Sequence, residues 1–225
     1  MSGAGLYESL YRLGYGSDNL MIHYTPVLNA LRYVSNHDRI YSVLDVGCSH
    51  GGGVKYLWNM GIVASGIDVS ATAAEMAIKS HGDEQSMCIG PCFQNASVTS
   101  LPFENNSFHA LISTDVLEHL DDAEVPTAVA EMARVTQRYM FLKISNRLES
   151  IKMQHTRAPY SNDTYARAAM KQFGHKVPPH LHTSVHGQEW WVDAFNQTEF
   201  RPSNKYRIRV PSWACCAFVL ERTFP

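Results

Sequence analysis

Long apolar runs are missing from this 225-residue chain, and so is an excess of charge of one sign. No stretch approaches the roughly 18 consecutive apolar residues typical of a membrane-spanning helix. Lys and Arg number 19 and Asp and Glu number 21, which gives a formal net charge of −2 and a pI near 6.6. Nucleic-acid-binding proteins usually carry a basic patch, and only Lys205, Arg207 and Arg209 resemble one. The sequence therefore argues against a membrane or a nucleic acid as partner.

Cysteine is also scarce, with five residues that form no paired C-x-x-C arrangement of the zinc-binding kind. Cys88 and Cys92 are separated by three residues, so they do not form such an arrangement either. Such usage favours reduced thiols in an intracellular chain. The N-terminus has neither the charged region nor the apolar region of a signal peptide. We therefore expect a cytoplasmic protein.

Apolar residues make up 45% of the chain, enough for a sizeable core, and the length suits one α/β domain. Strand-like runs alternate with helical patterns and predict right-handed βαβ units in a parallel sheet. The expected strands cover 40–46, 62–69, 87–93, 108–114 and 138–144, with a closing pair at 205–210 and 214–221. We divide the single domain, 1–225, into N-terminal helices (1–36), a core (37–144), an irregular insertion (145–186) and a closing helix and hairpin (187–225).

A glycine-rich turn follows the first expected strand, in the stretch Asp45-Val46-Gly47-Cys48-Ser49-His50-Gly51-Gly52-Gly53. Glycines let backbone N–H groups and a helix N-terminus approach a ligand closely. The next strand ends in Gly66-Ile67-Asp68, where a carboxylate would meet the hydroxyls of a ribose. A dinucleotide is the competing ligand, but the turn lacks the full G-x-G-x-x-G spacing. The two motifs predict a site for a nucleotide-type cofactor.

Two later motifs, Leu101-Pro102-Phe103-Glu104-Asn105-Asn106-Ser107-Phe108 and Asp115-Val116-Leu117-Glu118-His119-Leu120, complete a pattern. In this order the four motifs resemble those of class I S-adenosylmethionine (SAM)-dependent methyltransferases. The resemblance runs from about Ile40 to Lys143. It implies an α/β fold with a seven-stranded, mostly parallel Rossmann-like sheet, helices on both faces and an antiparallel last strand. It also implies SAM as cofactor and S-adenosylhomocysteine (SAH) as product.

The resemblance further implies which residues bind SAM. Asp45 would lie near the amino end of the methionine moiety, and Asp68 would bind the ribose. Ser49 stands where the family often has glycine, and we expect ordinary backbone angles there. Asn95 or Ser97 stands where relatives carry an acidic residue for the adenine amino group; we favour Ser97, and expect that a backbone N–H could serve adenine instead. The full predicted set is Asp45, Gly47, Cys48, Ser49, Gly51, Asp68, Val69, Ser97, Val98, Thr114 and Asp115.

Aromatic and histidine residues flank the core. In related methyltransferases the segment before the first strand closes over the cofactor, which makes Tyr11, Tyr15 and Tyr24 candidates for substrate binding; packing of the N-terminal helices is the alternative. Trp190 is a further candidate for lining the pocket.

Two histidines are candidates for a general base, because the ordinary pKa of histidine lies near working pH. They are His119, after the fourth strand, and His182, in the insertion. His180, His182 and His186 could together bind a metal ion. No cysteine or carboxylate stands at ligand spacing near them, so we expect no metal site.

The predicted activity is direct transfer of a methyl group from SAM to an oxygen or nitrogen of a small-molecule acceptor. Such an enzyme mainly needs alignment, close approach and one group that takes a proton. Two alternatives stay open, a nucleic-acid or protein methyltransferase that works with a partner, and a non-catalytic SAM-binding module. The sequence also leaves open a homodimer or a partner subunit.

Overall fold

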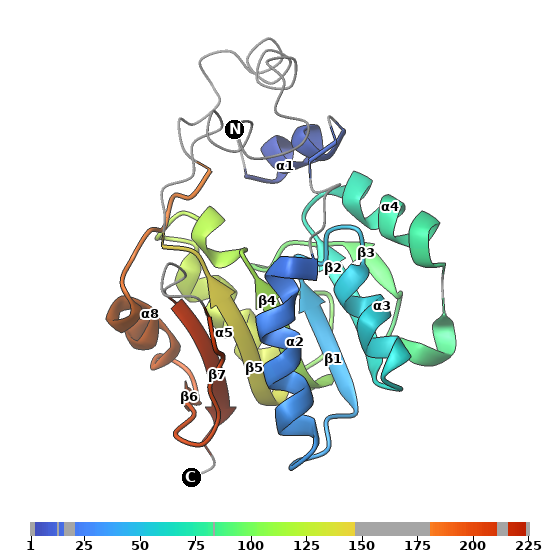
Figure 1. Cartoon of the computed structure of the whole chain (residues 1–225). Coiled ribbons are helices and arrows are strands. Elements are labelled where there is room, and N and C mark those ends of the chain that lie inside the picture. The colour runs from blue at the N-terminus through green and yellow to red at the C-terminus, as the bar shows by residue number, and fades with distance from the viewer. Residues whose placement is uncertain are drawn as a thin grey trace.

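The computed structural model describes residues 3–12, 14–15, 21–82, 84–146, 181–210 and 216–223, which form one seven-stranded sheet (Figure 1). The strand order is β3-β2-β1-β4-β5-β7-β6. β7 is antiparallel to both of its neighbours, whereas the other pairs are parallel. The strands are β1 Ser42–Val46, β2 Val63–Asp68, β3 Phe93–Asn95, β4 Phe108–Thr114, β5 Thr136–Ile144, β6 Phe200–Pro202 and β7 Cys216–Arg222. The predicted fold class is confirmed.

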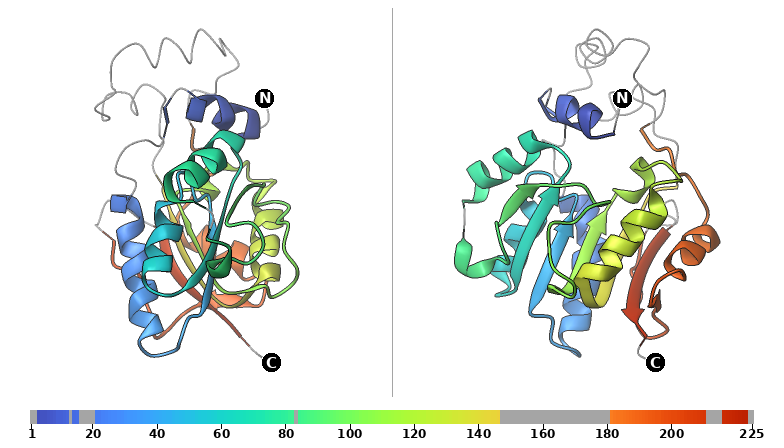
Figure 2. Two further views of the ribbon diagram at one scale, coloured as in Figure 1. Left: turned by 90° about the vertical axis from the view of Figure 1, so that its right-hand side faces the viewer. Right: turned by 180° about the vertical axis from the view of Figure 1, so that it is seen from behind.

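Helices cover both faces of this sheet, as the side view in Figure 2 shows. α2 (Met21–Ser35) and α3 (Gly52–Asn59) cover one face, and α5 (Val125–Val135) and α8 (Gln188–Phe195) cover the other. α4 (Ala71–His81) follows β2, and Ser70 caps it by accepting a hydrogen bond from the backbone N–H of Ala73. Because both faces are covered, β1 and β4 are buried along their whole length.

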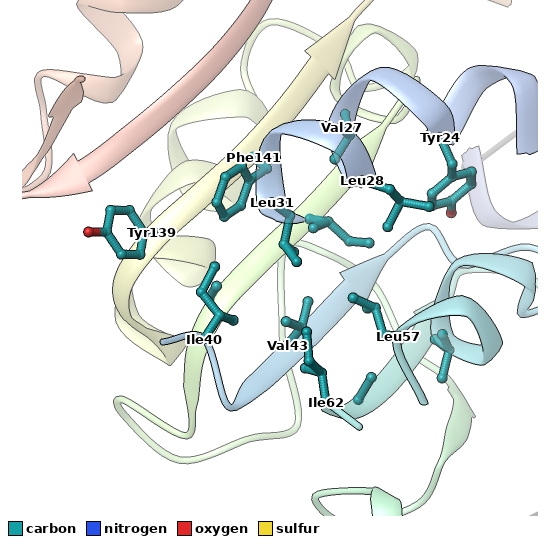
Figure 3. Close-up of a cluster of buried hydrophobic side chains, with 14 of the residues drawn as sticks. Tyr24, Val27, Leu28, Leu31, Ile40, Val43, Leu57, Ile62, Tyr139 and Phe141 are labelled. Carbon is teal, nitrogen blue, oxygen red and sulfur yellow. The ribbon is translucent and has the colours of Figure 1, made fainter. Parts of the chain in front are cut away.

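Each face carries its own apolar core. Figure 3 shows the core under α2, where side chains at helical spacing meet β1, β4 and β5. These α2 residues are Val27, Leu28, Leu31 and Val34. The core on the other face contains Trp191, Phe195 and Phe200, all fully buried. Both cores hold the sheet rigidly, so that loops at the carboxyl ends of its strands have fixed positions.

α1 (Gly3–Arg12) lies across those carboxyl ends (Figure 1). Leu6 and Leu10 pack against Leu181 from the far side of the sequence. Glu8 accepts hydrogen bonds from the Thr72 hydroxyl at 2.7 Å, the Ser70 hydroxyl at 2.8 Å and the Thr72 N–H at 3.1 Å. These bonds, led by that from the Thr72 side chain, lower the pKa of Glu8 to about 2. A carboxylate is favourable at a helix N-terminus, so Glu8 joins α1 to the start of α4.

The third strand differs from its predicted position at 87–93. Gln85–Met87 form a single 3₁₀ turn, η1, and the strand begins only at Phe93. Gly90 has a φ of +68°, and Pro91 has no N–H to donate to a sheet. The resulting turn brings the Cα atoms of Cys88 and Cys92 to 5.1 Å, and their sulfurs are joined in a disulfide. The expectation of reduced thiols is wrong for this pair.

The closing hairpin also differs, because β7 pairs with Phe200–Pro202 and not with 205–210. The Ser203 hydroxyl accepts hydrogen bonds from the N–H groups of Lys205 and Tyr206, and this turn takes the chain away from the sheet. Tyr206 and Ile208 are still buried, which explains the alternating pattern in the sequence. Most of the predicted insertion at 145–186 lies outside the described residues. Among the described helices, none has the length and apolar character needed to cross a bilayer.

Candidate active site

The glycine-rich turn between β1 and α3 has an unusual backbone. Gly47 and Gly51 have φ values of +78° and +79°, and Ser49 has a φ of +48°. The expectation of ordinary angles at Ser49 is therefore wrong. This residue adopts the left-handed conformation, in which its N–H donates to Asp68 Oδ2 at 3.0 Å. A Cβ at Gly47 would lie 2.2 Å from Val116 Cγ2, so the turn passes close to the end of β4.

Two buried carboxylates flank this turn, one at the end of β1 and one at the end of β2. Burial raises the pKa of Asp45 to about 8 and that of Asp68 to about 6. Asp68 also accepts a hydrogen bond from the Ser70 N–H at 3.0 Å. The hydroxyl of Tyr24 donates to Asp45 Oδ1 and to the Gly47 carbonyl, at 3.2 and 3.1 Å. Tyr24, predicted to bind substrate, is thus buried, and its hydroxyl stabilises the glycine-rich turn.

Several buried polar atoms at these strand ends make no hydrogen bond within the described part of the chain. They are Asp45 Oδ2, Ser49 Oγ, His50 Nε2, Ser113 Oγ and Thr114 Oγ1. A buried polar atom without a partner costs about 1–3 kcal/mol. A polar ligand at this edge of the sheet would remove that cost. Such donors and acceptors fit a cofactor with an amino-acid end and a ribose.

The predicted adenine-side residues lie after β3. Ser97 Oγ bonds to Thr99 Oγ1 at 2.8 Å and accepts from the Thr99 N–H at 3.2 Å, so this side chain stabilises its own turn. Val98 is buried in the core beside α5. The Asn95 side chain donates to the Val69 carbonyl at 2.7 Å. Cofactor contacts of Val69, Ser97 and Val98 remain predictions.

Asp115 follows β4 in a left-handed conformation, with a φ of +55°. Its carboxylate forms an ion pair with Lys143 of β5 and a 3.1 Å contact with His23 Nδ1. Burial alone would raise the pKa of Asp115, but the His23 hydrogen bond and the Lys143 charge hold it below its usual value. The carboxylate at this predicted cofactor position is therefore ionised.

A second polar cluster, Glu118–His119–His182, lies next along the same edge. The ligand-type atoms of these three residues all lie within 4.8 Å of one another. Glu118 is fully buried, and its Oε1 accepts from the Ser145 N–H at 2.8 Å. The His119 and His182 rings meet edge to face, with centroids 4.7 Å apart. The structure thus brings together the two predicted base candidates.

The fold places a carboxylate beside His182 although none stands at ligand spacing near it in the sequence. Sequence reasoning missed Glu118 as a partner, because 64 positions separate it from His182 in a chain where only folding brings them together. His186 is not in the cluster; its ring contacts Asp122 at 2.8 Å and stacks on Trp190 at a centroid distance of 3.8 Å. His180 lies outside the described residues.

Comparison with known proteins identifies one part of the chain. Residues 44–139 match a family model described as a methyltransferase domain. This part of the chain is a SAM-dependent methyltransferase domain. SAM is therefore the methyl donor. No curated protein sequence matches this chain.

Solved structures agree with the fold of this methyltransferase. Magnesium protoporphyrin IX methyltransferase from Synechocystis PCC 6803, with bound SAH, is 15% identical with a TM-score of 0.61, over 99% of this chain and 95% of that one. The 1,6-didemethyltoxoflavin-N1-methyltransferase of Burkholderia thailandensis is 15% identical with a TM-score of 0.58, over 98% and 89%. A Haloferax volcanii putative methyltransferase, in complex with its Trm112 activator, is 14% identical with a TM-score of 0.57, over 90% and 91%.

In this methyltransferase, α1 spans both polar regions of the site. The Tyr11 hydroxyl donates to Asp68 Oδ2 at 3.4 Å, and its ring contacts Tyr15 and His50. One helical turn earlier, the Tyr7 hydroxyl lies 2.6 Å from His119 Nδ1. Tyr7 was not predicted, although its spacing of four residues from Tyr11 places both on one helix face. Trp190, on α8, contacts His186 and Trp191 instead of these tyrosines.

Proposed function

We propose that this methyltransferase transfers the methyl group to an oxygen or nitrogen of a small-molecule acceptor that binds beneath α1, beside His119 and His182. The observation that carries this proposal is the position of α1, whose Tyr11 contacts Asp68 and whose Tyr7 contacts His119. One helix turn therefore separates the predicted ribose carboxylate from the histidine pair. The acceptor needs that closeness, because methyl transfer requires near-attack distances of about 3–3.5 Å.

The surroundings of the site favour a small acceptor. Leu6, Leu10 and Leu181 form an apolar cluster above the strand ends, with Tyr7 and Tyr15 packed against it. Small-molecule sites are concave, mostly apolar and supplied with a few polar groups. Two structurally similar proteins are named for small acceptors, magnesium protoporphyrin IX and 1,6-didemethyltoxoflavin. At 15% identity they support the fold and leave the acceptor to be tested.

Each part of the chain has a separate role in this proposal. The glycine turn, Asp45 and Asp68 bind and orient SAM, which supplies the methyl group. Tyr11 and Tyr15 cover it. His119 and His182 lie where the acceptor loses its proton, and general bases of this kind contribute about 10²–10⁴-fold to rate.

The test is SAH release from SAM with a panel of small phenols, alcohols and amines. We expect release with at least one class, and a fall of about a hundredfold or more in turnover for His182→Ala. His37→Ala is the matched control, because this histidine is exposed and its ring contacts Tyr33 at the end of α2, away from the site. Full turnover of His182→Ala between about pH 6 and 9 would disprove its role in proton removal. SAH release that requires RNA, DNA or a protein would disprove the small acceptor.

One observation favours a second candidate, a polyanionic macromolecular acceptor. Lys205, Arg207 and Arg209 are exposed, while Tyr206 and Ile208 between them are buried, so the three charges form a strip on one side. Activity on nucleic acid that falls steeply with added salt would support this candidate. SAH release with any acceptor also excludes a non-catalytic SAM-binding module.

A further inference from the structure

We infer that Glu118, His119 and His182 form a binding site for a single divalent transition-metal ion of the Zn²⁺ type, which holds the acceptor's oxygen. Two imidazoles and one carboxylate are a donor set that suits Zn²⁺ and leaves a fourth position open for another ligand. The site itself follows from the side chains, whereas its role in catalysis rests on the proposed function.

The carboxylate supplies the first argument. Glu118 is fully buried, and its Oε1 is held by the Ser145 N–H. Its Oε2 is also buried and makes no hydrogen bond within the described part of the chain. The carbonyl of the same residue accepts from the N–H groups of Thr183 and Ser184, at 2.8 and 3.1 Å. The backbone thus fixes this carboxylate against the segment that carries His182, and one oxygen remains for a ligand.

The hydrogen bonds of His119 supply the second argument. Its Nδ1 lies 3.0 Å from the Leu181 carbonyl and 2.6 Å from the Tyr7 hydroxyl. A carbonyl oxygen only accepts, so the Leu181 contact is a hydrogen bond in the tautomer that carries its proton on Nδ1 and its lone pair on Nε2. Metal-binding histidines commonly donate their other ring N–H to a backbone carbonyl, which fixes ring and tautomer in this way. The Leu181 carbonyl is placed to favour this metal-binding tautomer of His119.

The distances fit an ion that binds with small side-chain rotations. Ligands about 2.0–2.2 Å from a tetrahedral ion lie roughly 3.5 Å from one another. The three ligand-type atoms now lie within 4.8 Å. Lys143 on the neighbouring strand β5 is paired with Asp115, so among the described residues this charge is neutralised at close range.

An ion here makes an acceptor hydroxyl the preferred substrate group. A bound metal lowers the pKa of an oxygen ligand, so the hydroxyl releases its proton to solvent and the oxygen keeps further lone pairs. The new O–CH₃ bond forms as the S–CH₃ bond of SAM breaks, and neutral SAH leaves. An amine bound through its single lone pair could not attack. His119 and His182 then act as metal ligands in place of general bases, and the site narrows the proposed acceptor atom from oxygen or nitrogen to oxygen.

Metal binding by the full chain, after removal of bound ions with a chelator, tests the inference without any acceptor. Zn²⁺ is measured by elemental analysis, and Co²⁺ by the visible absorption that reports nitrogen and oxygen ligands in low coordination. We expect one ion per chain. Glu118→Gln and His182→Ala should each weaken Co²⁺ binding by about tenfold or more, while His37→Ala should not change it.

Two results would overturn the inference. One is a wild-type chain that binds no stoichiometric Co²⁺ or Zn²⁺. The other is binding that is equally strong in Glu118→Gln, His182→Ala and His37→Ala. SAM affinity and thermal unfolding of each variant report its fold; if Glu118→Gln does not fold, His182→Ala alone decides. Small-molecule methyl transfer without metal binding would leave the proposed function intact and reject the metal site.

Discussion

In the cofactor region of the site, Asp45, the glycine turn and Asp68 all come from one βαβ unit. In the acceptor region, Glu118, His119, His182 and Tyr7 come from three segments far apart in sequence. The first region is held by backbone contacts, such as the Gly47 and Cys48 N–H groups donating to the Ile67 carbonyl at 2.8 and 2.9 Å. The second depends on the docking of α1 and the 181–186 segment, in which the Thr183 N–H donates to the Glu118 carbonyl at 2.8 Å.

This difference has a physical consequence for what can change. Backbone contacts within one βαβ unit survive most side-chain substitutions, so SAM binding can stay constant while the acceptor changes. The acceptor region is built on segments outside the sheet, where loops carry function and vary most. We therefore expect substitutions in the glycine turn to change the affinity for SAM. Substitutions beneath Tyr7 should instead change the activity toward the acceptor.

The largest expected effect comes from Gly47→Ala. The left-handed conformation costs a non-glycine residue about 1–2 kcal/mol, and the new Cβ would lie 2.2 Å from Val116 Cγ2. Overpacking of this kind typically costs a further 1–3 kcal/mol or so. We expect about 2–5 kcal/mol lower stability by denaturant unfolding, and loss of measurable SAM binding by calorimetry.

Gly61→Ala is the matched control for this prediction. Gly61 has a similar φ of +73°, but a Cβ there would meet nothing within 4 Å. It should therefore cost only the conformational part, about 1–2 kcal/mol, and leave SAM affinity unchanged. Equal losses in the two variants would mean that the approach of Val116 to the turn is not important.

The two regions also differ in how far the sequence predicts them. The strand ends at Asp45 and Asp68 follow from hydrophobic periodicity and glycine placement, which are local signals. The sequence did not predict the left-handed Ser49, because that angle depends on the hydrogen bond from its N–H to Asp68 on another strand. It did not predict Glu118 beside His182 either, because only the docking of the 181–186 segment brings them together. The predicted strand at 205–210 was wrong, although its alternating burial was predicted correctly. A turn at Ser203 takes this segment away from the sheet, so it does not pair with β7.

A smaller effect, tied to protonation, is expected at Asp45. Burial raises its pKa from an ordinary 3.8 to about 8 in the ligand-free protein, so the folded state binds the extra proton over that range. Stability of the ligand-free protein should therefore fall as pH rises from about 4 to about 8. If the cationic amino end of SAM lies beside Asp45, binding lowers this pKa and releases a proton below pH 8.

Calorimetry in buffers of different ionisation enthalpy measures that proton. We expect nearly one proton released per SAM at pH 6, and an affinity that rises about tenfold per pH unit between 6 and 7, since one pKa unit is worth about 1.36 kcal/mol. Asp45→Asn should abolish the pH dependence above pH 7, where Asp68, with a pKa of about 6, is already ionised. Proton uptake at pH 6 would show that Asp45 does not face the amino group.

The smallest expected effects come from substitutions of the two tyrosines of α1, and these substitutions distinguish the cofactor region from the acceptor region. Tyr11→Phe removes the 3.4 Å hydrogen bond to Asp68 but keeps the ring that packs on Tyr15 and His50. A hydrogen bond contributes about 0.5–1.5 kcal/mol net, so the Kd for SAM should rise roughly 2- to 10-fold. Tyr7→Phe removes the contact with His119 instead, and should leave SAM affinity unchanged while it lowers turnover by a similar factor. Titration of SAM into both variants measures the difference, and an equal rise in Kd would mean that α1 acts as a single cover over one undivided site. Both hydroxyls lie on one face of α1, where the cofactor region meets the acceptor region. An equal rise in Kd would therefore show that these two regions are not separate.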